Sequence, residues 1–190
     1  SSRSVVQRCV LTGNGDLDDE YGDIYLASGT LGLTNVLVAK SDGGSGVYVE
    51  QGVASIDQCT LVTNSQYGLN KGAGLVTVRN TIAKFNDFGG VNNADSVANS
   101  CLQELIDGVG NTIVDPLFAD TDYWHVDSRA GRYAGGFLGG GSWTVSAQDS
   151  PVVDLGDPVA DYSREADPNG CRVNMGYDGN TPAASKTYLE

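Results

Sequence analysis

A repeat of about 22 residues in the first part of the chain constrains the fold more than any other feature. Three-residue segments align five times, each ending in an aliphatic residue: Cys9-Val10-Leu11, Asn35-Val36-Leu37, Cys59-Thr60-Leu61, Asn80-Thr81-Ile82 and Ser100-Cys101-Leu102. A second column follows in four of these units and ends at Ile24, Val47, Leu69 and Val91. Two columns that keep step indicate a solenoid, in which successive turns of the chain stack on one another.

Each unit contains short β-branched runs, such as Val47-Tyr48-Val49, separated by Gly, Asn, Asp and Ser. Such a unit has no room for a helix of normal length, and it lacks the regular leucines of a leucine-rich repeat. We therefore predict an all-β chain: a right-handed parallel β-helix of about five rungs over residues 1–110. Residues 111–190 are expected to form the last strands and an irregular C-terminal cap.

The aligned segments also predict which side chains point inward. Stacked rungs bury equivalent residues against each other, so the aliphatic column Leu11, Leu37, Leu61, Ile82 and Leu102 is expected to form one interior ladder. Residues two positions earlier lie on the same face of a strand, so a ladder of small or amide side chains is expected at Cys9, Asn35, Cys59, Asn80 and Ser100.

The composition changes after residue 110. All five prolines and both tryptophans lie beyond this point. The last rung of a solenoid exposes apolar core and unpaired backbone groups, which must be covered. We expect residues 111–190 to provide that cover, with Leu117, Phe118, Trp124 and Val126 packing on the final rung.

The same region carries a family resemblance. The segments Asp115-Pro116-Leu117-Phe118, Asp122 to Ser128 (DYWHVDS), Asp149 to Pro158 (DSPVVDLGDP) and Asn169 to Thr181 (NGCRVNMGYDGNT) resemble the C-terminal signature of secreted bacterial right-handed parallel β-helix repeat proteins. The resemblance implies a pectate-lyase-like solenoid, export to the cell surface or the medium, and a carbohydrate-related context. Cys171 departs from the pattern, because glycine is expected at its position.

The net charge of the chain limits the classes of molecule that it can bind. Eleven Lys and Arg against 24 Asp and Glu give a net charge of -13. This charge disfavours nucleic acid, anionic membranes and acidic substrates as partners. No apolar run approaches the roughly 18 residues of a membrane-spanning helix.

Candidate metal and thiol sites are few. The acidic stretch with Asp16, Asp18, Asp19, Glu20 and Asp23 offers several oxygens for Ca²⁺, although it lacks the EF-hand spacing, and a solvated loop is the alternative. The four cysteines, at 9, 59, 101 and 171, are far apart and are expected to be free thiols rather than a zinc site.

No catalytic constellation stands out. Asp23, Glu50 and Asp57 adjoin strands but share no offset from the repeat columns, and Lys40, Lys71, Arg79 and Lys84 are scattered. His125 is the sole histidine and is expected to be structural, because sequence neighbours on a strand alternate faces and form no triad. Aromatic residues of the C-terminal part could stack on sugars, although the cap would bury several of them.

These observations favour a non-catalytic β-helix module of an exported or surface bacterial protein, with polysaccharide as the expected partner. The alternative is the C-terminal part of a polysaccharide lyase or glycoside hydrolase with catalytic rungs upstream. The first rung begins without a cap, and its free edge predicts either self-association or cover by upstream rungs of a parent chain.

Overall fold

A computed structural model describes residues 2–15, 21–138 and 140–189 of the chain, and these contain strands but no helix. The strands are β1 (Arg3–Thr12), β2 (Ile24–Leu26), β3 (Thr30–Ala39), β4 (Val47–Val49), β5 (Val53–Asp57), β6 (Thr60–Val62), β7 (Tyr67–Lys71), β8 (Leu75–Arg79), β9 (Ile82–Lys84), β10 (Gly89–Asn92), β11 (Ser96–Ala98), β12 (Cys101–Leu102), β13 (Arg132–Ala134) and β14 (Ser142–Thr144). The all-β prediction is confirmed.

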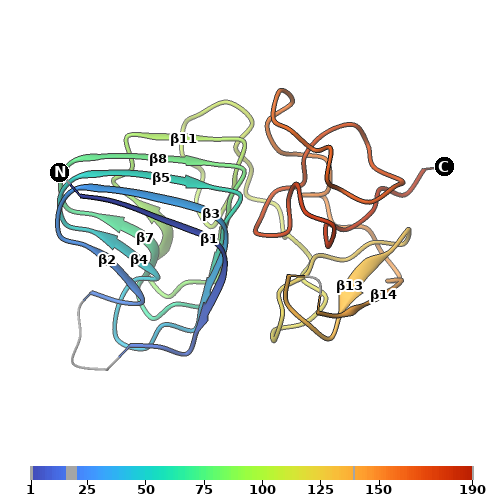
Figure 1. The fold of residues 1–190 in the computed structure, drawn as a ribbon, viewed down its shortest axis with the longest axis horizontal. Helices are drawn as coiled ribbons and strands as arrows, with labels where there is room; N and C mark the ends of the chain where they lie inside the picture. The colour runs from blue at the N-terminus through green and yellow to red at the C-terminus, as the bar shows by residue number, and fades with distance from the viewer. Residues whose placement is uncertain (1, 16–20, 139, 190) are drawn as a thin grey trace.

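The first twelve strands form a parallel β-solenoid of about four turns (Figure 1). One eight-stranded sheet has the order β11-β8-β5-β3-β6-β9-β12, with β1 paired to β3. A four-stranded sheet, β10-β7-β4-β2, forms another side. All of these strand pairs are parallel, and equivalent strands of successive turns lie side by side. The right-handedness of the coil and the count of five rungs stay predictions.

The second repeat column is confirmed residue by residue. Ile24 pairs with Val47, Val47 with Leu69, and Leu69 with Val91. All four pack in the interior of the solenoid.

The first column is wrong at two positions. The structural column is Leu11, Val38, Leu61, Ala83 and Leu102, which faces the interior. Leu37 and Ile82 belong to the neighbouring column and face the C-terminal part of the chain. A shift of one residue moves a strand side chain to the opposite face.

Backbone geometry explains the error. Arg8, Asn35, Gln58, Asn80 and Asn99 all have φ between 47° and 54°, and they occupy one corner of successive turns. Asparagine tolerates this left-handed conformation better than most residues. Asn35 and Asn80 therefore mark the corner, whereas the sequence alignment placed them with the following interior position.

The C-terminal part lies beside the solenoid, at the carboxyl ends of β3, β5 and β8 (Figure 1). Trp124 and Tyr177 pack on Leu37 and Val62, while Val126, Val152 and Met175 pack on Ile82 and Cys101. The apolar side chains of this part cover a lateral face that several turns share, and the last turn belongs to that face through Cys101.

Corner amides fasten the two parts together. The Asn35 side chain donates to the carbonyl oxygens of Tyr177 and Gly179, at 3.0 and 2.7 Å. Asn80 accepts from the Asp157 backbone N–H at 2.6 Å. These contacts satisfy backbone groups of the irregular segment that no strand partner reaches.

The last turn is covered by the segment that follows it directly. Thr112 bridges to Cys101, and its carbonyl accepts from the Leu102 N–H. Ile106 packs against the interior, and the Glu104 carboxylate accepts from the N–H groups of Gly90 and Val91 at 2.9 and 3.1 Å. The edge of β10 is thus capped by a charged side chain, a common protection of exposed edges.

Candidate functional site

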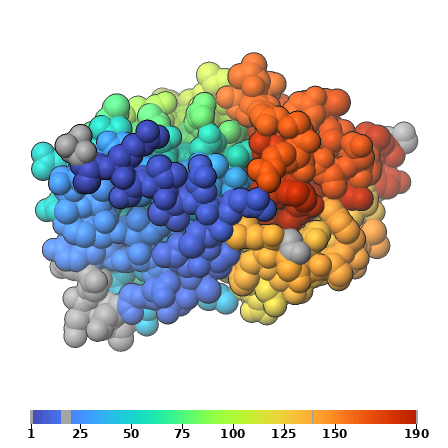
Figure 2. Space-filling view, viewed as in Figure 1, coloured from blue at the N-terminus to red at the C-terminus, as the bar shows by residue number. Residues whose placement is uncertain are grey.

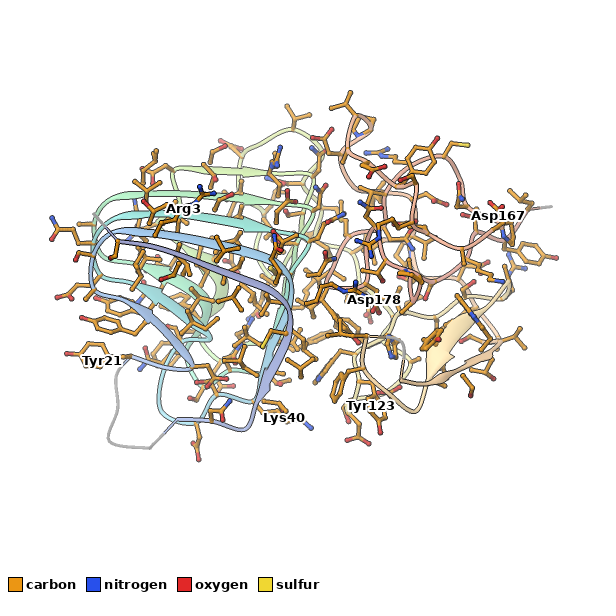
Figure 3. The ribbon with its side chains drawn as sticks, viewed as in Figure 1. Arg3, Tyr21, Lys40, Tyr123, Asp167 and Asp178 are labelled. Atoms are coloured by element: carbon orange, nitrogen blue, oxygen red, sulfur yellow. The ribbon has the colours of Figure 1, made fainter. Side chains whose placement is uncertain are left out.

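An exposed tyrosine cluster lies on the outer face of the β2-β4-β7-β10 sheet. Tyr25 and Tyr48 pair in register on β2 and β4, with ring centroids 5.9 Å apart and planes 13° apart. Tyr21 joins them, 4.5 Å from Tyr25 and 6.1 Å from Tyr48. Figure 3 shows Tyr21 on the side of the solenoid away from the C-terminal part. Tyr21 and Tyr25 are 46% and 41% exposed, an unusual amount of aromatic surface for one sheet face.

The column changes from tyrosine to asparagine on the next strands. Tyr48 pairs with Asn70 on β7, and Asn70 pairs with Asn92 on β10. The Asn92 side chain donates to the Asn70 side-chain oxygen at 2.9 Å. Asparagine is shorter than tyrosine. The space that a tyrosine ring at position 70 would fill therefore stays open beside Tyr48.

This space is a hollow of about 300 Å³, lined by Tyr21, Tyr48, Gln66 and Asn70. Two tyrosine rings provide its apolar surface, and two amides provide donors and acceptors. The Gln66 side chain is oriented by its bond to the Gly43 carbonyl, 3.1 Å away. We call Tyr21, Tyr25, Tyr48, Gln66 and Asn70 the tyrosine face.

A carboxylate lies at the rim of the tyrosine face. The Tyr25 hydroxyl donates to Glu50, and this hydrogen bond raises the pKa of Tyr25 to about 12. Tyr25 therefore stays neutral at physiological pH, and Glu50 provides the negative charge at the rim. An anionic ligand is disfavoured here by that charge and by the net charge of the chain.

The predicted calcium ligands Asp16, Asp18, Asp19 and Glu20 lie outside the described residues. Asp23 is described: it is half-buried, and its carboxylate accepts from Asn14 at 3.4 Å. Burial raises the pKa of Asp23, although hydrogen bonds from Ser41 and Asn14 act in the opposite direction. In the described ranges, no three His, Cys, Asp or Glu side chains are grouped as a metal site requires.

The candidate cations each have a different partner. Three of them form ion pairs: Lys71 with Asp95 at 2.9 Å, Arg79 with Asp57 at 2.7 Å, and Lys40 with Asp122 at 3.9 Å. The fourth, the buried Lys84, donates to the Ile113 carbonyl. Asp57 and Arg79 also line a polar hollow of about 270 Å³ between the solenoid and the C-terminal part.

His125 is fully buried and structural in its contacts. Its Nδ1 lies 2.6 Å from Asp178, and its Nε2 lies 2.7 Å from the Gly136 carbonyl. Asp178 lies at the junction with the solenoid (Figure 3). Burial alone would lower the pKa of His125, but the hydrogen bond and charge of Asp178 outweigh it and raise that pKa.

The aromatic residues singled out in the C-terminal part are mostly used in packing. Trp124 and Tyr177 are 4% and 1% exposed. The exposed aromatic cluster lies instead on the solenoid, at tyrosines that sequence reasoning did not single out. The signal was present in the sequence, since Tyr25 and Tyr48 each directly follow the second repeat column.

The described residues include no helix long and apolar enough to cross a membrane. Comparisons of the chain with protein-family models, with curated proteins and with solved structures found no match. The parallel β-solenoid therefore rests on the strand pairing, and any function rests on the surface described above.

Proposed function

We propose that this chain is a non-catalytic β-solenoid module that binds a neutral polysaccharide through the tyrosine face. The observation that supports the proposal best is the hollow beside Tyr48, where the aromatic column gives way to Asn70. A pyranose ring placed there has one apolar face for stacking and hydroxyl groups for the amides of Gln66 and Asn70.

The orientation of the column favours a chain rather than a single sugar. Tyr25, Tyr48, Asn70 and Asn92 lie on four adjacent strands, which are spaced about 4.8 Å apart. A polysaccharide that runs along the solenoid contacts each of these positions in turn. The resemblance of the C-terminal segments to secreted bacterial β-helix proteins is consistent with this partner, and with export to the surface or the medium.

Affinity electrophoresis tests the proposal. The protein is run through gels that contain a neutral β-glucan, xylan or galactomannan, and polygalacturonate serves as the anionic comparison. We expect retardation by at least one neutral polymer. Tyr48→Ala should weaken binding about fivefold, since an aromatic contact contributes about 1 kcal/mol.

Two further variants separate binding from folding. Asn70→Tyr extends the tyrosine column and fills the hollow, so it should abolish binding while the protein stays folded. Tyr188→Ala removes an exposed tyrosine of the C-terminal part and serves as the matched control. If no neutral polymer retards the protein, or if Asn70→Tyr binds as the parent does, the proposal is wrong.

A further inference from the structure

A second hollow lies where the solenoid meets the C-terminal part, and the tyrosine face does not include it. Its volume is about 390 Å³, and it is lined by Thr63, Phe85, Asp115, Leu117, Phe118, Thr121, Trp124 and Gln148. Thr63 and Phe85 follow β6 and β9 of the solenoid, whereas the other residues come from the C-terminal part. We call it the aromatic hollow.

Three aromatic rings form much of its surface. The Phe118 ring packs edge-to-face against Trp124 at 5.0 Å and against Phe85 at 6.2 Å. Phe85 is 49% exposed although it is a large apolar side chain. Phe85 and the half-buried Phe118 therefore offer the hollow more ring surface than Trp124, which is 4% exposed.

The backbone holds these rings in an uncommon conformation. Phe85, Leu117 and Trp124 have φ values of 57°, 50° and 59°, in the left-handed region that large side chains rarely adopt. Phe85 directly follows β9 as Lys40 follows β3 and Thr63 follows β6, and all three have positive φ, so Phe85 projects from a corner that successive turns share. Trp124 is fixed by its contacts with Leu37 and Val62, so its position is set before any ligand arrives.

The residues that line the aromatic hollow carry only negative charge. Asp115 is the one charged residue among those lining it, and the lining contains no Lys or Arg. One Asp115 oxygen accepts from the Leu117 N–H at 2.9 Å, which orients the carboxylate at the rim. The other polar lining residues, Thr63, Thr121 and Gln148, are neutral.

We propose that the aromatic hollow binds an organic cation of the quaternary ammonium class. Aromatic faces carry negative potential and attract weakly hydrated cations, and a carboxylate beside them completes the charge match. The net charge of -13 adds to this preference and opposes anions. Four of the eight lining residues are apolar, and three of these four carry aromatic rings.

Tryptophan fluorescence of the intact chain tests the proposal, because one of its two tryptophans lines the hollow. Trp143→Phe removes the other one, which is 40% exposed in β14, and leaves Trp124 as the sole reporter. The variant is titrated with choline and with 3,3-dimethylbutan-1-ol, an uncharged molecule of nearly the same shape. We expect choline to change the Trp124 emission and to bind about tenfold more tightly than the alcohol.

Matched substitutions identify the groups involved. Asp115→Asn keeps an oxygen for the Leu117 N–H but loses the charge, so it should remove most of the preference for choline and leave binding of the alcohol unchanged. Phe85→Ala should weaken choline binding about tenfold, whereas Phe88→Ala, at a more exposed phenylalanine away from the hollow, should not.

Three results would overturn the proposal. The first is that choline leaves the Trp124 emission unchanged at millimolar concentration. The second is that choline and the alcohol bind equally well, which would make the hollow a merely apolar cavity. The third is that Asp115→Asn leaves the choline preference intact.

Discussion

The side-chain nitrogen of Asn64 donates to the side-chain oxygen of Asn86, 2.8 Å away, inside the corner between the two large sheets of the solenoid. The backbone N–H of Asn64 donates to the same oxygen at 3.0 Å, and Asn86 is bonded in turn to Gln103 on the next turn. Both asparagines are at most 2% exposed. This amide ladder links successive turns where the chain leaves the sheets.

Asn86→Ala should destabilise the fold by about 1–3 kcal/mol, because it leaves the buried N–H of Asn64 without its acceptor. Urea denaturation followed by circular dichroism measures the change. Asn14→Ala, at an exposed asparagine, is the control and should change stability by less than about 0.5 kcal/mol. Equal effects of the two substitutions would show that the ladder does not stabilise the fold.

The ladder also shows what the sequence could and could not predict. The 22-residue period and the column Ile24, Val47, Leu69 and Val91 follow from stacking alone, and the structure confirms that column. The corner residues could not be aligned, because asparagine serves both as a left-handed corner at Asn80 and as a buried ladder residue at Asn64. Spacing does not distinguish these two uses.

The candidate site was harder to predict than the fold. Which tyrosines are exposed depends on what covers each face of the solenoid, and the position of the C-terminal part decides that. The sequence predicted a cover over the last turn, whereas the C-terminal part also covers earlier turns, on the side that carries Leu37 and Ile82. The opposite side, with Tyr25 and Tyr48, is left to solvent.

Substitutions at two leucines distinguish the contact with the C-terminal part from the interior of the solenoid. Leu37→Ala should destabilise the protein by about 2–5 kcal/mol and shift the Trp124 emission to longer wavelength before global unfolding, since Trp124 packs on Leu37. Leu61→Ala removes the same group from the interior and should destabilise without this early shift. An early shift in Leu61→Ala alone would contradict the placement of the C-terminal part.

Stability should fall as pH rises from about 4.5 to about 7. Burial raises the pKa of Glu165 to about 7, while the N–H groups of Asn174 and Asn180 that bond to its carboxylate act in the opposite direction. The folded state thus holds a proton that the unfolded state releases near its usual pKa. The resulting loss amounts to about 3 kcal/mol at most.

Melting temperatures measured from pH 4.5 to 8 test this dependence. Glu165→Gln should flatten the curve between pH 4.5 and 7. His125, whose pKa is raised, contributes stability below pH 6.5 that is lost at higher pH, so a smaller slope should remain there. A Glu165→Gln profile that overlays the parent's would disprove the role of Glu165.

The thiols should differ sharply in reactivity. Burial raises the pKa of Cys59 and of Cys101 to about 12, whereas Cys171 is exposed. Ellman's reagent at pH 8 should therefore label Cys171 first, the half-buried Cys9 more slowly, and Cys59 and Cys101 only in denaturant. Labelling of all four at one rate in the native protein would contradict the buried positions.

The first turn has free strand edges. Within the described residues, β1 pairs only with β3 and β2 only with β4, and β1 lies across the surface in Figure 2. We propose that two copies associate through this edge. The charge of -13 opposes contact, so association should strengthen as the Debye length falls from about 30 Å at 0.01 M salt to about 10 Å at 0.1 M. Sedimentation velocity decides the matter, and a strict monomer at high salt would rule the contact out.

Chemical-shift mapping with the polysaccharide that retards the protein most tests the central claim directly. In a ¹⁵N-labelled sample, the account predicts that the largest amide shifts fall on β4 and β7 around Tyr48, Gln66 and Asn70, and that Asn70→Tyr abolishes them. Largest shifts on the C-terminal part or around Asp57 and Arg79, or shifts that persist in Asn70→Tyr, would contradict binding at the tyrosine face.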